Sequence, residues 1–339
     1  MSLISQWRRV ALAFAVTVLA VVDLSAAPAH GQSGADFYKG KTVTYIVATS
    51  PGGGYDTYGR LVAEYMQRYL PEATVVVRNM PGAGHMIGTN AIYAAKPDGL
   101  TIGTFNTGLI YNQLIRHKGV RFDLTAMSWI GKAASEGRIM AIAQQSPIRT
   151  YQDLAAQKTP VNFAAAGIGS AAYVETVMLT SALKLPIKIL TGYNGNDDML
   201  AMRRGEITGT ISARSTWEPF VKNGYARYIA QIGGDERDVP QLSTMITDPG
   251  AKALVALIQT QCDVARLTAG PPGIPADRLA ALRDAYRKAM EDKEFLAKTA
   301  KLGLPVQPAY GDTVLAMVKE ALNQSPETVA LLAQALKKK

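Results

Sequence analysis

The chain has 339 residues, of which 48% are hydrophobic and 19% are charged. A chain of this length can bury a sizeable core, and it suggests about two domains. Its 30 glycines and 17 prolines are close to average usage, so the composition excludes collagen-like, low-complexity and disordered proteins.

The first 29 residues have the layout of a secretory signal peptide. A short basic start at residues 7–9 precedes an uncharged apolar run at 10–22, and the small residues Ala27 and Ala29 follow. The run spans only about 20 Å as a helix, less than the roughly 30 Å hydrocarbon core, which disfavours a permanent membrane anchor. We therefore predict cleavage after Ala29, or one or two residues away, and a periplasmic product.

The mature chain is basic but has no pronounced basic patch. Removing 29 residues leaves 310 and changes the net charge from +9 to +8, because Arg8, Arg9 and Asp23 are lost. Net positive charge favours anionic partners without identifying them. The basic residues are scattered apart from the run at 337–339, which disfavours nucleic acid as a partner. Cys262 is the single cysteine, and we expect it to be buried and unreactive.

After the cleavage site, β-branched runs alternate with amphipathic helical stretches. Strands are predicted at 42–48, 74–77 and 100–105, with helices between them. A second set follows, with strands at 161–164, 187–191 and 208–212 and helices after Ser170 and at 194–204. Strands separated by helices of this length indicate crossover connections and parallel sheets. The sequence thus predicts two α/β domains.

The remainder is predicted to be helical. After a break at 271–273, one helix is expected at 275–291, and Ser325 followed by Pro326 marks the start of a terminal helix. We expect these helices to pack back on the first domain. The predicted organisation is then a first lobe of residues 30–135 and 263–339 and a second lobe of 136–262, with crossings near 129–140 and 262–269.

Two glycine-rich loops, residues 51–57 and 80–85, each connect a predicted strand to a helix. Ligands of open parallel sheets bind beyond the carboxyl ends of the strands, and amides at a helix start attract anions. The residues alone support tight turns and anion binding equally. A nucleotide loop is disfavoured because Gly54 precedes Tyr55 rather than lysine, and Thr57 stands where a dinucleotide fingerprint needs glycine. Asp56 is interpreted as a helix cap rather than a ligand contact.

The loops at 51–57 and 79–84, together with Arg60 and residues 97–99, resemble in order and spacing the receptor family of tripartite tricarboxylate transporters, the Bug-type periplasmic solute-binding proteins. The resemblance continues at 129–131, 192–193, 204–206 and 271–275. It therefore covers essentially the whole mature chain.

The resemblance implies a two-lobed type II periplasmic-binding-protein fold, in which each lobe is a mainly parallel sheet flanked by helices. Such a protein closes on a small organic acid and delivers it to the integral membrane permease subunits of a tripartite transporter, as a monomer without cofactor or metal. The binding residues that it implies are Gly53, Gly54, Tyr55, Asp56, Thr57, Pro81, Gly82, Ala83, Gly84, His85, Asn106, Thr107, Gly169, Ser170, Ala171, Tyr193 and Ser212.

Three positions depart from the family pattern. Tyr55 and His85 stand where many relatives have a small residue and a glycine, which predicts a narrower or more aromatic pocket. His85 is equally compatible with an anion contact and with a surface position. Tyr173 replaces an expected histidine in the second lobe, so the specificity at that end is open.

Two other classes of function are alternatives to solute transport. An exported hydrolase is disfavoured because the nucleophile motif is absent around residues 167–170 and the mature chain has only His30, His85 and His117. The acidic pair at 197–198 fits the first turn of a helix better than a metal site. A receptor that signals through a membrane partner cannot be separated from a transport receptor by sequence.

Overall fold

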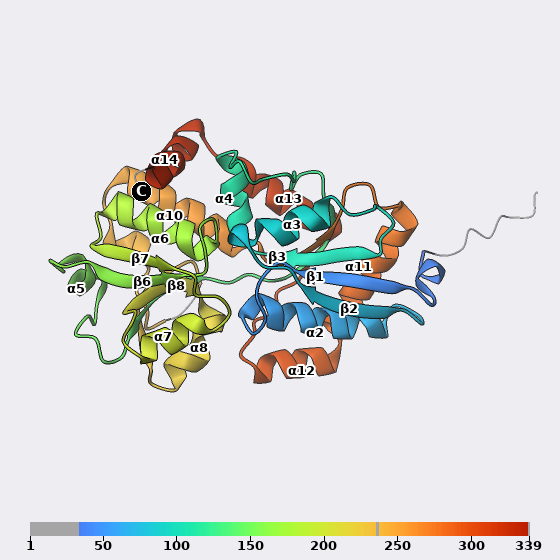
Figure 1. Cartoon of the computed structure of the whole chain (residues 1–339), viewed down its shortest axis with the longest axis horizontal. Coiled ribbons are helices and arrows are strands. Elements are labelled where there is room, and N and C mark those ends of the chain that lie inside the picture. The colour runs from blue at the N-terminus through green and yellow to red at the C-terminus, as the bar shows by residue number, and fades with distance from the viewer. Residues whose placement is uncertain (1–33, 235–236, 338–339) are drawn as a thin grey trace, which may run out of the picture. The chain divides into compact units, whose positions relative to one another are not determined.

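The computed structural model describes residues 34–337 except 235–236, and the predicted signal peptide and His30 lie outside this part. Residues from Gly34 onward form one compact unit with two β-sheets (Figure 1). Within the described residues, no helix has both the length and the apolarity needed to cross a bilayer.

The first sheet has the order β2-β1-β3-β10-β4-β11, and β1 lies parallel to both of its neighbours. β10 runs antiparallel to β3 and β4, and β11 antiparallel to β4. The strands are β1 (Thr42–Val47), β2 (Thr74–Asn79), β3 (Thr101–Phe105), β4 (Ser128–Ala134), β10 (Ala265–Gly270) and β11 (Ala309–Tyr310).

Helices cover both faces of this sheet, and together they form the first lobe. One apolar core lies under α2 (Gly54–Arg68), α11 (Ala276–Glu291) and α12 (Lys293–Lys301). The other lies under α3 (Met86–Tyr93), α4 (Gly108–Leu114) and α13 (Gly311–Leu322). Figure 1 shows α2 and α12 on one side of the strands and α3 and α13 on the other. Two short 3-10 helices, η1 (Asp36–Tyr38) and η2 (Ala83–His85), complete this lobe.

The second sheet has the order β7-β6-β8-β5-β9 and defines the second lobe. β6 is parallel to β7 and β8, whereas β5 is antiparallel to β8 and β9. Its strands are β5 (Arg138–Ala143), β6 (Val161–Ala165), β7 (Ile187–Thr191), β8 (Gly209–Ala213) and β9 (Ala226–Ile232). Its helices are α5 (Tyr151–Ala155), α6 (Ala171–Leu183), α7 (Asp197–Arg203), α8 (Arg214–Lys222), α9 (Leu242–Met245), α10 (Pro249–Cys262) and α14 (Pro326–Lys337).

The predicted two-lobed α/β class is confirmed, but both sheets are mixed rather than mainly parallel. The parallel pairs come from strand-helix-strand units, as the helical spacing predicted. The antiparallel pairs involve β4, β5 and β10, the strands next to the connections between the lobes. These connections are residues 135–137 and 263–264, inside the predicted crossing regions. We propose lobe boundaries at these two places and a third between α13 and α14, because α14 packs on the second lobe.

The terminal helix does not pack where it was expected. Residues 263–339 were predicted to return to the first lobe, but α14 packs on the second. Ser325 does cap it, because the Thr328 amide donates to Ser325 Oγ at 3.2 Å. However, α14 contacts α6 and α10, and Leu332 is fully buried in the second-lobe core. The periodicity of an amphipathic helix defines its apolar face but not the lobe that will cover that face.

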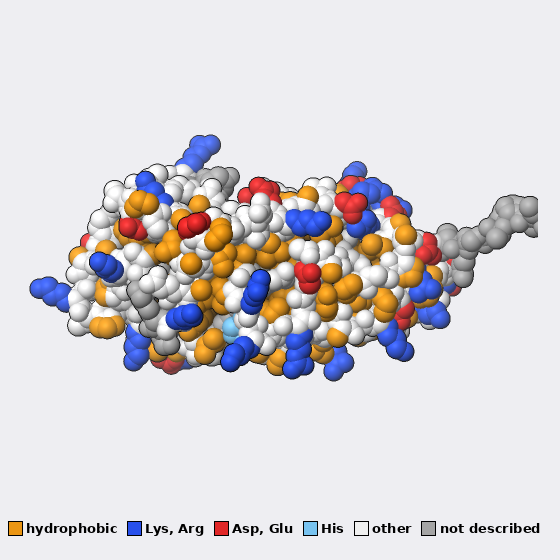
Figure 2. All heavy atoms as spheres, turned by 90° about the horizontal axis from the view of Figure 1, so that it is seen from above, with side chains coloured by type: hydrophobic (Ala, Val, Ile, Leu, Met, Phe, Trp, Pro, Cys, Tyr) orange, Lys and Arg blue, Asp and Glu red, His pale blue; other side chains and the backbone are white. Residues whose placement is uncertain are grey.

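Charged side chains are dispersed on the face seen in Figure 2. Lys and Arg side chains are scattered over it, with Asp and Glu side chains between them, rather than gathered in one patch. This distribution agrees with the scattered basic residues of the sequence.

We predict that Leu332→Ala lowers the free energy of unfolding by about 2–5 kcal/mol, because truncating a fully buried leucine leaves a cavity. Leu296→Ala, at a leucine that is 40% exposed in α12, should cost much less. Urea denaturation of both variants measures the difference. Equal losses would contradict the placement of α14 in the second-lobe core.

Candidate functional site

The loop before α2 is organised by Asp56. Its Oδ2 accepts hydrogen bonds from the Gly52 amide at 2.9 Å and from Arg60 Nε at 3.0 Å, and its Oδ1 accepts from Asn79 Nδ2 at 2.8 Å. Burial alone would raise the pKa of Asp56, but these bonds outweigh it and hold the pKa below its usual value. Asp56 therefore shapes the loop and is not among the residues that line the pocket.

The N-terminus of α2 opens into a pocket between the two lobes. Gly53 is the N-cap residue and has no side-chain capping bond, and Gly53, Gly54 and Tyr55 all line the pocket. A Cβ at Gly54 would lie 2.7 Å from Thr216 Oγ1 and 3.0 Å from Arg266 Nη2. Glycine at position 54 thus lets the helix end approach the guanidinium of Arg266.

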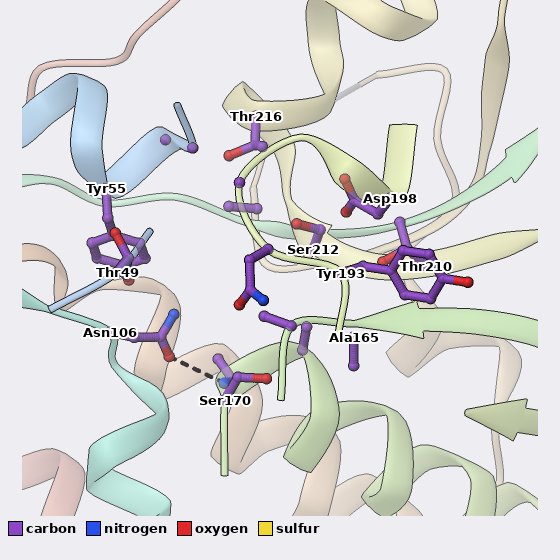
Figure 3. A pocket seen from close by; sticks show the side chains of 18 of the residues that line it. Thr49, Tyr55, Asn106, Ala165, Ser170, Tyr193, Asp198, Thr210, Ser212 and Thr216 are labelled. Atoms are coloured by element: carbon purple, nitrogen blue, oxygen red, sulfur yellow. Dashed lines mark hydrogen bonds between the residues drawn. The ribbon is translucent and has the colours of Figure 1, made fainter. Parts of the chain in front are cut away.

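At the N-terminus of α6, in the second lobe, by contrast, two of the amides already have side-chain hydrogen-bond acceptors. Ser170 Oγ accepts from the Tyr173 amide at 3.3 Å, and Asn106 Oδ1 accepts from the Ala171 amide at 3.1 Å. Figure 3 shows the second of these bonds, which joins the two lobes. Asn106, Ser170 and Ala171 all line the pocket.

The second glycine-rich loop contacts the other lobe at Gly84. Gly82, Ala83, Gly84 and His85 all have positive φ angles. A Cβ at Gly84 would lie 2.3 Å from the carbonyl oxygen of Ile168, so glycine there permits direct backbone contact with the second lobe. Of this loop only His85 lines the pocket.

His85 is buried and uncharged near neutral pH. Its Nδ1 lies 3.0 Å from the carbonyl oxygen of Ala48. Burial lowers the pKa of His85 to about 4, although the hydrogen bond to Ala48 opposes the shift. His85 therefore lines the pocket as a neutral ring, and not as the exposed residue that was the alternative.

Two buried arginines also line the pocket, each paired with a glutamate. Arg138 donates from Nε to Glu175 at 3.0 Å, and Arg266 donates from Nη2 to Glu136 at 2.8 Å. In both cases burial is the largest single effect and lowers the pKa of the guanidinium, but the neighbouring glutamate and nearby tyrosines together raise it above its usual value. Both arginines remain charged.

Aromatic rings hold Arg266 in place. Its guanidinium carbon lies 4.4 Å from the ring centre of Tyr55 and 4.7 Å from that of Tyr58. Both rings come from α2, so the first lobe holds Arg266 from the same helix whose N-terminus opens into the pocket. Arg266 has a positive φ of 58°, an uncommon backbone conformation for a residue with a side chain.

The structure brings about half of the sequence-predicted residues to the pocket. Those that line it are Gly53, Gly54, Tyr55, His85, Asn106, Ser170, Ala171, Tyr193 and Ser212. Those that do not are Asp56, Thr57, Pro81, Gly82, Ala83, Gly84, Thr107 and Gly169. Thr107 supports the wall instead, because its hydroxyl accepts from Arg138 Nη2 at 3.3 Å.

Other residues that line the pocket were not among the predicted binding residues. They are Thr49, Ser50, Arg138, Ala164, Ala165, Ala166, Ala172, Asn194, Gly195, Asp198, Thr210, Ala213, Thr216 and Arg266. Thr49 follows β1 and so agrees with the rule that ligands bind beyond the carboxyl ends of strands, whereas Thr210 lies near the start of β8. Arg138 and Arg266 could not be singled out, because nothing in the sequence marks them as buried. Among the described residues, no group of three or more His, Cys, Asp or Glu is placed to hold a metal ion.

We predict that Glu136→Gln destabilises the protein by about 3–5 kcal/mol, because it leaves the buried charge of Arg266 without its counter-ion. Glu64→Gln, which breaks the exposed pair with Lys298, should cost less than about 1 kcal/mol. Chemical denaturation at pH 7 compares the two. A loss at Glu136 as small as that at Glu64 would refute the role of the buried pair.

His85 should make the stability depend on pH below about 6.5. Its folded pKa of about 4 lies below the ordinary value of 6.5, so the unfolded chain binds more protons between these values. The stability that the neutral ring contributes is present above pH 6.5 and is lost as the pH falls toward 4. Denaturation of the wild type and of His85→Gln from pH 4 to 8 should show a smaller fall for the variant. Identical profiles would contradict the burial of a neutral ring.

Comparisons with known proteins agree on one family. The model of the tripartite tricarboxylate transporter family receptor matches residues 59–331. The "UPF0065 protein in gbd 5'region" of Cupriavidus necator is 24% identical over 296 residues, which is 86% of each chain. Protein BugT of Bordetella pertussis is 25% identical over 222 residues, 62% of this chain and 67% of BugT.

Solved structures share the fold. The periplasmic binding protein BugD superposes with a TM-score of 0.74 at 21% identity, covering 88% of this chain and 98% of BugD. MatC from Rhodopseudomonas palustris, solved with bound malate, has a TM-score of 0.71 at 19% identity and covers 86% and 99%. The predicted periplasmic-binding-protein fold is thus confirmed, and the chain belongs to the receptor family of tripartite tricarboxylate transporters, a family of solute-binding proteins.

Proposed function

We propose that this protein is exported, is processed near Ala29, and captures a small organic carboxylate between its two lobes for delivery to the membrane permease of a tripartite transporter. Membership of the receptor family supports the general role. Two relatives of the same fold support the class of ligand, because MatC was solved with malate and a second R. palustris protein, Rpa4515, with adipate.

The observation that carries the carboxylate assignment is the uncapped N-terminus of α2 beside Arg266. The amides of a helix end and a guanidinium both donate hydrogen bonds to carboxylates. Arg266 Nε is buried without a hydrogen-bond acceptor among the described residues, and the hydroxyl of Thr49 is likewise unpartnered. A ligand carboxylate beside Gly54 would lie next to donors of both kinds, because the guanidinium of Arg266 adjoins this helix end.

The second lobe would supply the rest of the site. Tyr193 and Ser212 follow or lie in strands of that lobe, and both line the pocket with Thr210 (Figure 3). The sites at Ser170 and Ala171 are less available, because the Ala171 amide already donates to Asn106. We therefore propose that the first lobe binds the carboxylate of the ligand and that the second lobe contacts the rest of the ligand and sets its specificity.

Thermal-shift screening of the mature protein against mono-, di- and tricarboxylates, amino acids, aromatic acids and neutral solutes tests the proposal. An acid at 100 times its dissociation constant should stabilise the protein by about 2.7 kcal/mol. Stabilisation by neutral solutes alone, with no response to any acid, would refute the carboxylate assignment.

We predict that Gly84→Ala weakens binding of the best acid from this screen at least tenfold, because the added Cβ would meet the backbone of Ile168 and Gly169 in the other lobe. Gly205→Ala is the matched control: its φ is also positive, but a Cβ there meets nothing within 4 Å. Both substitutions carry a backbone cost of about 1–2 kcal/mol. Calorimetry should show a loss of affinity for Gly84→Ala alone. Equal affinities would show that contact at Gly84 is not needed for capture.

A further inference from the structure

Asp198 places a carboxylate in the wall of the pocket. It is the second residue of α7 and lines the pocket from the second lobe. Figure 3 shows it on the same side as Ser212, Tyr193 and Thr210, across the pocket from Tyr55 and Thr49. A carboxylate in this position is unexpected if the pocket receives only anions, because like charges repel at short range.

No Lys, Arg or His of the described residues forms an ion pair with Asp198. Among the described residues, its recorded hydrogen bond comes from the amide of Met199 at 2.8 Å, and it takes part in no ion pair. Burial raises the pKa of Asp198 to about 7, hydrogen bonds from the backbone oppose the shift, and the neighbouring charge of Asp197 adds to it. The ionised form is therefore the costly one in the unliganded pocket.

The other charges of the pocket wall are already balanced. The remaining titratable residues that line it are Tyr55, His85, Arg138, Tyr193 and Arg266. Arg138 and Arg266 each have a glutamate partner, and neither Glu175 nor Glu136 lines the pocket. His85 is neutral because burial lowers its pKa to about 4. An ionised Asp198 is thus the single uncompensated charge among these lining residues.

We propose that the ligand is a zwitterion, a carboxylate that also carries a protonated amine, and that Asp198 receives the amine while the end of α2 and Arg266 receive the carboxylate. The inference rests on the proposed function and narrows its ligand class. A cationic nitrogen provides both the hydrogen-bond donors and the opposite charge that a half-buried carboxylate lacks. A second carboxylate at the same place would instead require Asp198 to take up a proton.

A zwitterion and a dicarboxylate should have opposite effects on the protonation of Asp198 when they bind. An amine favours ionised Asp198, so its binding at pH 7 should release about half a proton from a group with a pKa near 7. Its affinity should rise about tenfold from pH 6 to pH 8, as the ionised fraction of Asp198 increases. A dicarboxylate should show proton uptake and a falling affinity over the same range.

Calorimetry with paired probes tests the proposal. The pairs differ by one amine: butyrate and 4-aminobutyrate, succinate and L-aspartate, glutarate and L-glutamate, and 3-phenylpropionate and L-phenylalanine. We expect the amine-bearing member of the pair that binds best to be at least tenfold tighter at pH 8. Titration in two buffers of different ionisation enthalpy should show proton release.

Asp198→Asn should remove this preference together with the proton release. Asp197→Asn, which removes the exposed neighbouring carboxylate in the same helical turn, should keep the preference, with the proton release moved to a slightly lower pH because the charge of Asp197 raises the pKa of Asp198. If the acids without an amine bind as tightly as their partners, and Asp198→Asn changes nothing, the inference is overturned while the carboxylate function stands. If no probe binds and the thermal-shift screen responds only to acids without an amine, the inference is overturned while the carboxylate function stands. If the screen responds to no acid at all, both fail.

Discussion

The buried ion pair between Arg266 and Glu136 is the interaction on which the rest of the structure depends. Glu136 lies in the first connection between the lobes and Arg266 in the strand that follows the second, so the pair ties the two connections together. Glu136 also accepts a hydrogen bond from the Ser215 amide at 2.7 Å, which attaches the start of α8 to the same point. Two charges removed from water are tolerated only when paired and hydrogen-bonded, and here the pairing coincides with the junction of the lobes.

The ion pair also orders the guanidinium of Arg266 before a ligand binds. Glu136 and the rings of Tyr55 and Tyr58 hold the guanidinium of Arg266, and Nε has no hydrogen-bond partner among the described residues. A donor that is already ordered does not lose side-chain entropy again when a ligand arrives. The first lobe thus provides a rigid, donor-rich end of the pocket, whereas the second lobe contributes hydroxyls and the unpaired carboxylate of Asp198. The two ends differ in charge, which is the basis for expecting a ligand with two different ends.

The two glycine-rich loops show which parts of the site could be predicted from the sequence. Both were predicted to grip the ligand. The loop at 51–57 opens the end of α2 into the pocket through Gly53 and Gly54, but the loop at 80–85 reaches it only through His85. Glycine permits close backbone approach, and the approaching partner can be a ligand or another part of the chain. At Gly84 it is the second lobe, a neighbour that is 84 residues further along the sequence at Ile168.

The amino-acid sequence by itself determined the α/β class, most of the strands and helices and the family, because periodicity, turn residues and motif spacing are local properties of the chain. Only the tertiary structure decided that α14 packs on the second lobe, that both sheets are mixed, and that Arg138, Arg266 and Asp198 meet in one pocket. These features depend on which distant surfaces cover one another and on how burial changes the charge of a side chain. Neither the packing of distant surfaces nor the effect of burial on charge can be predicted from the residues adjacent in sequence.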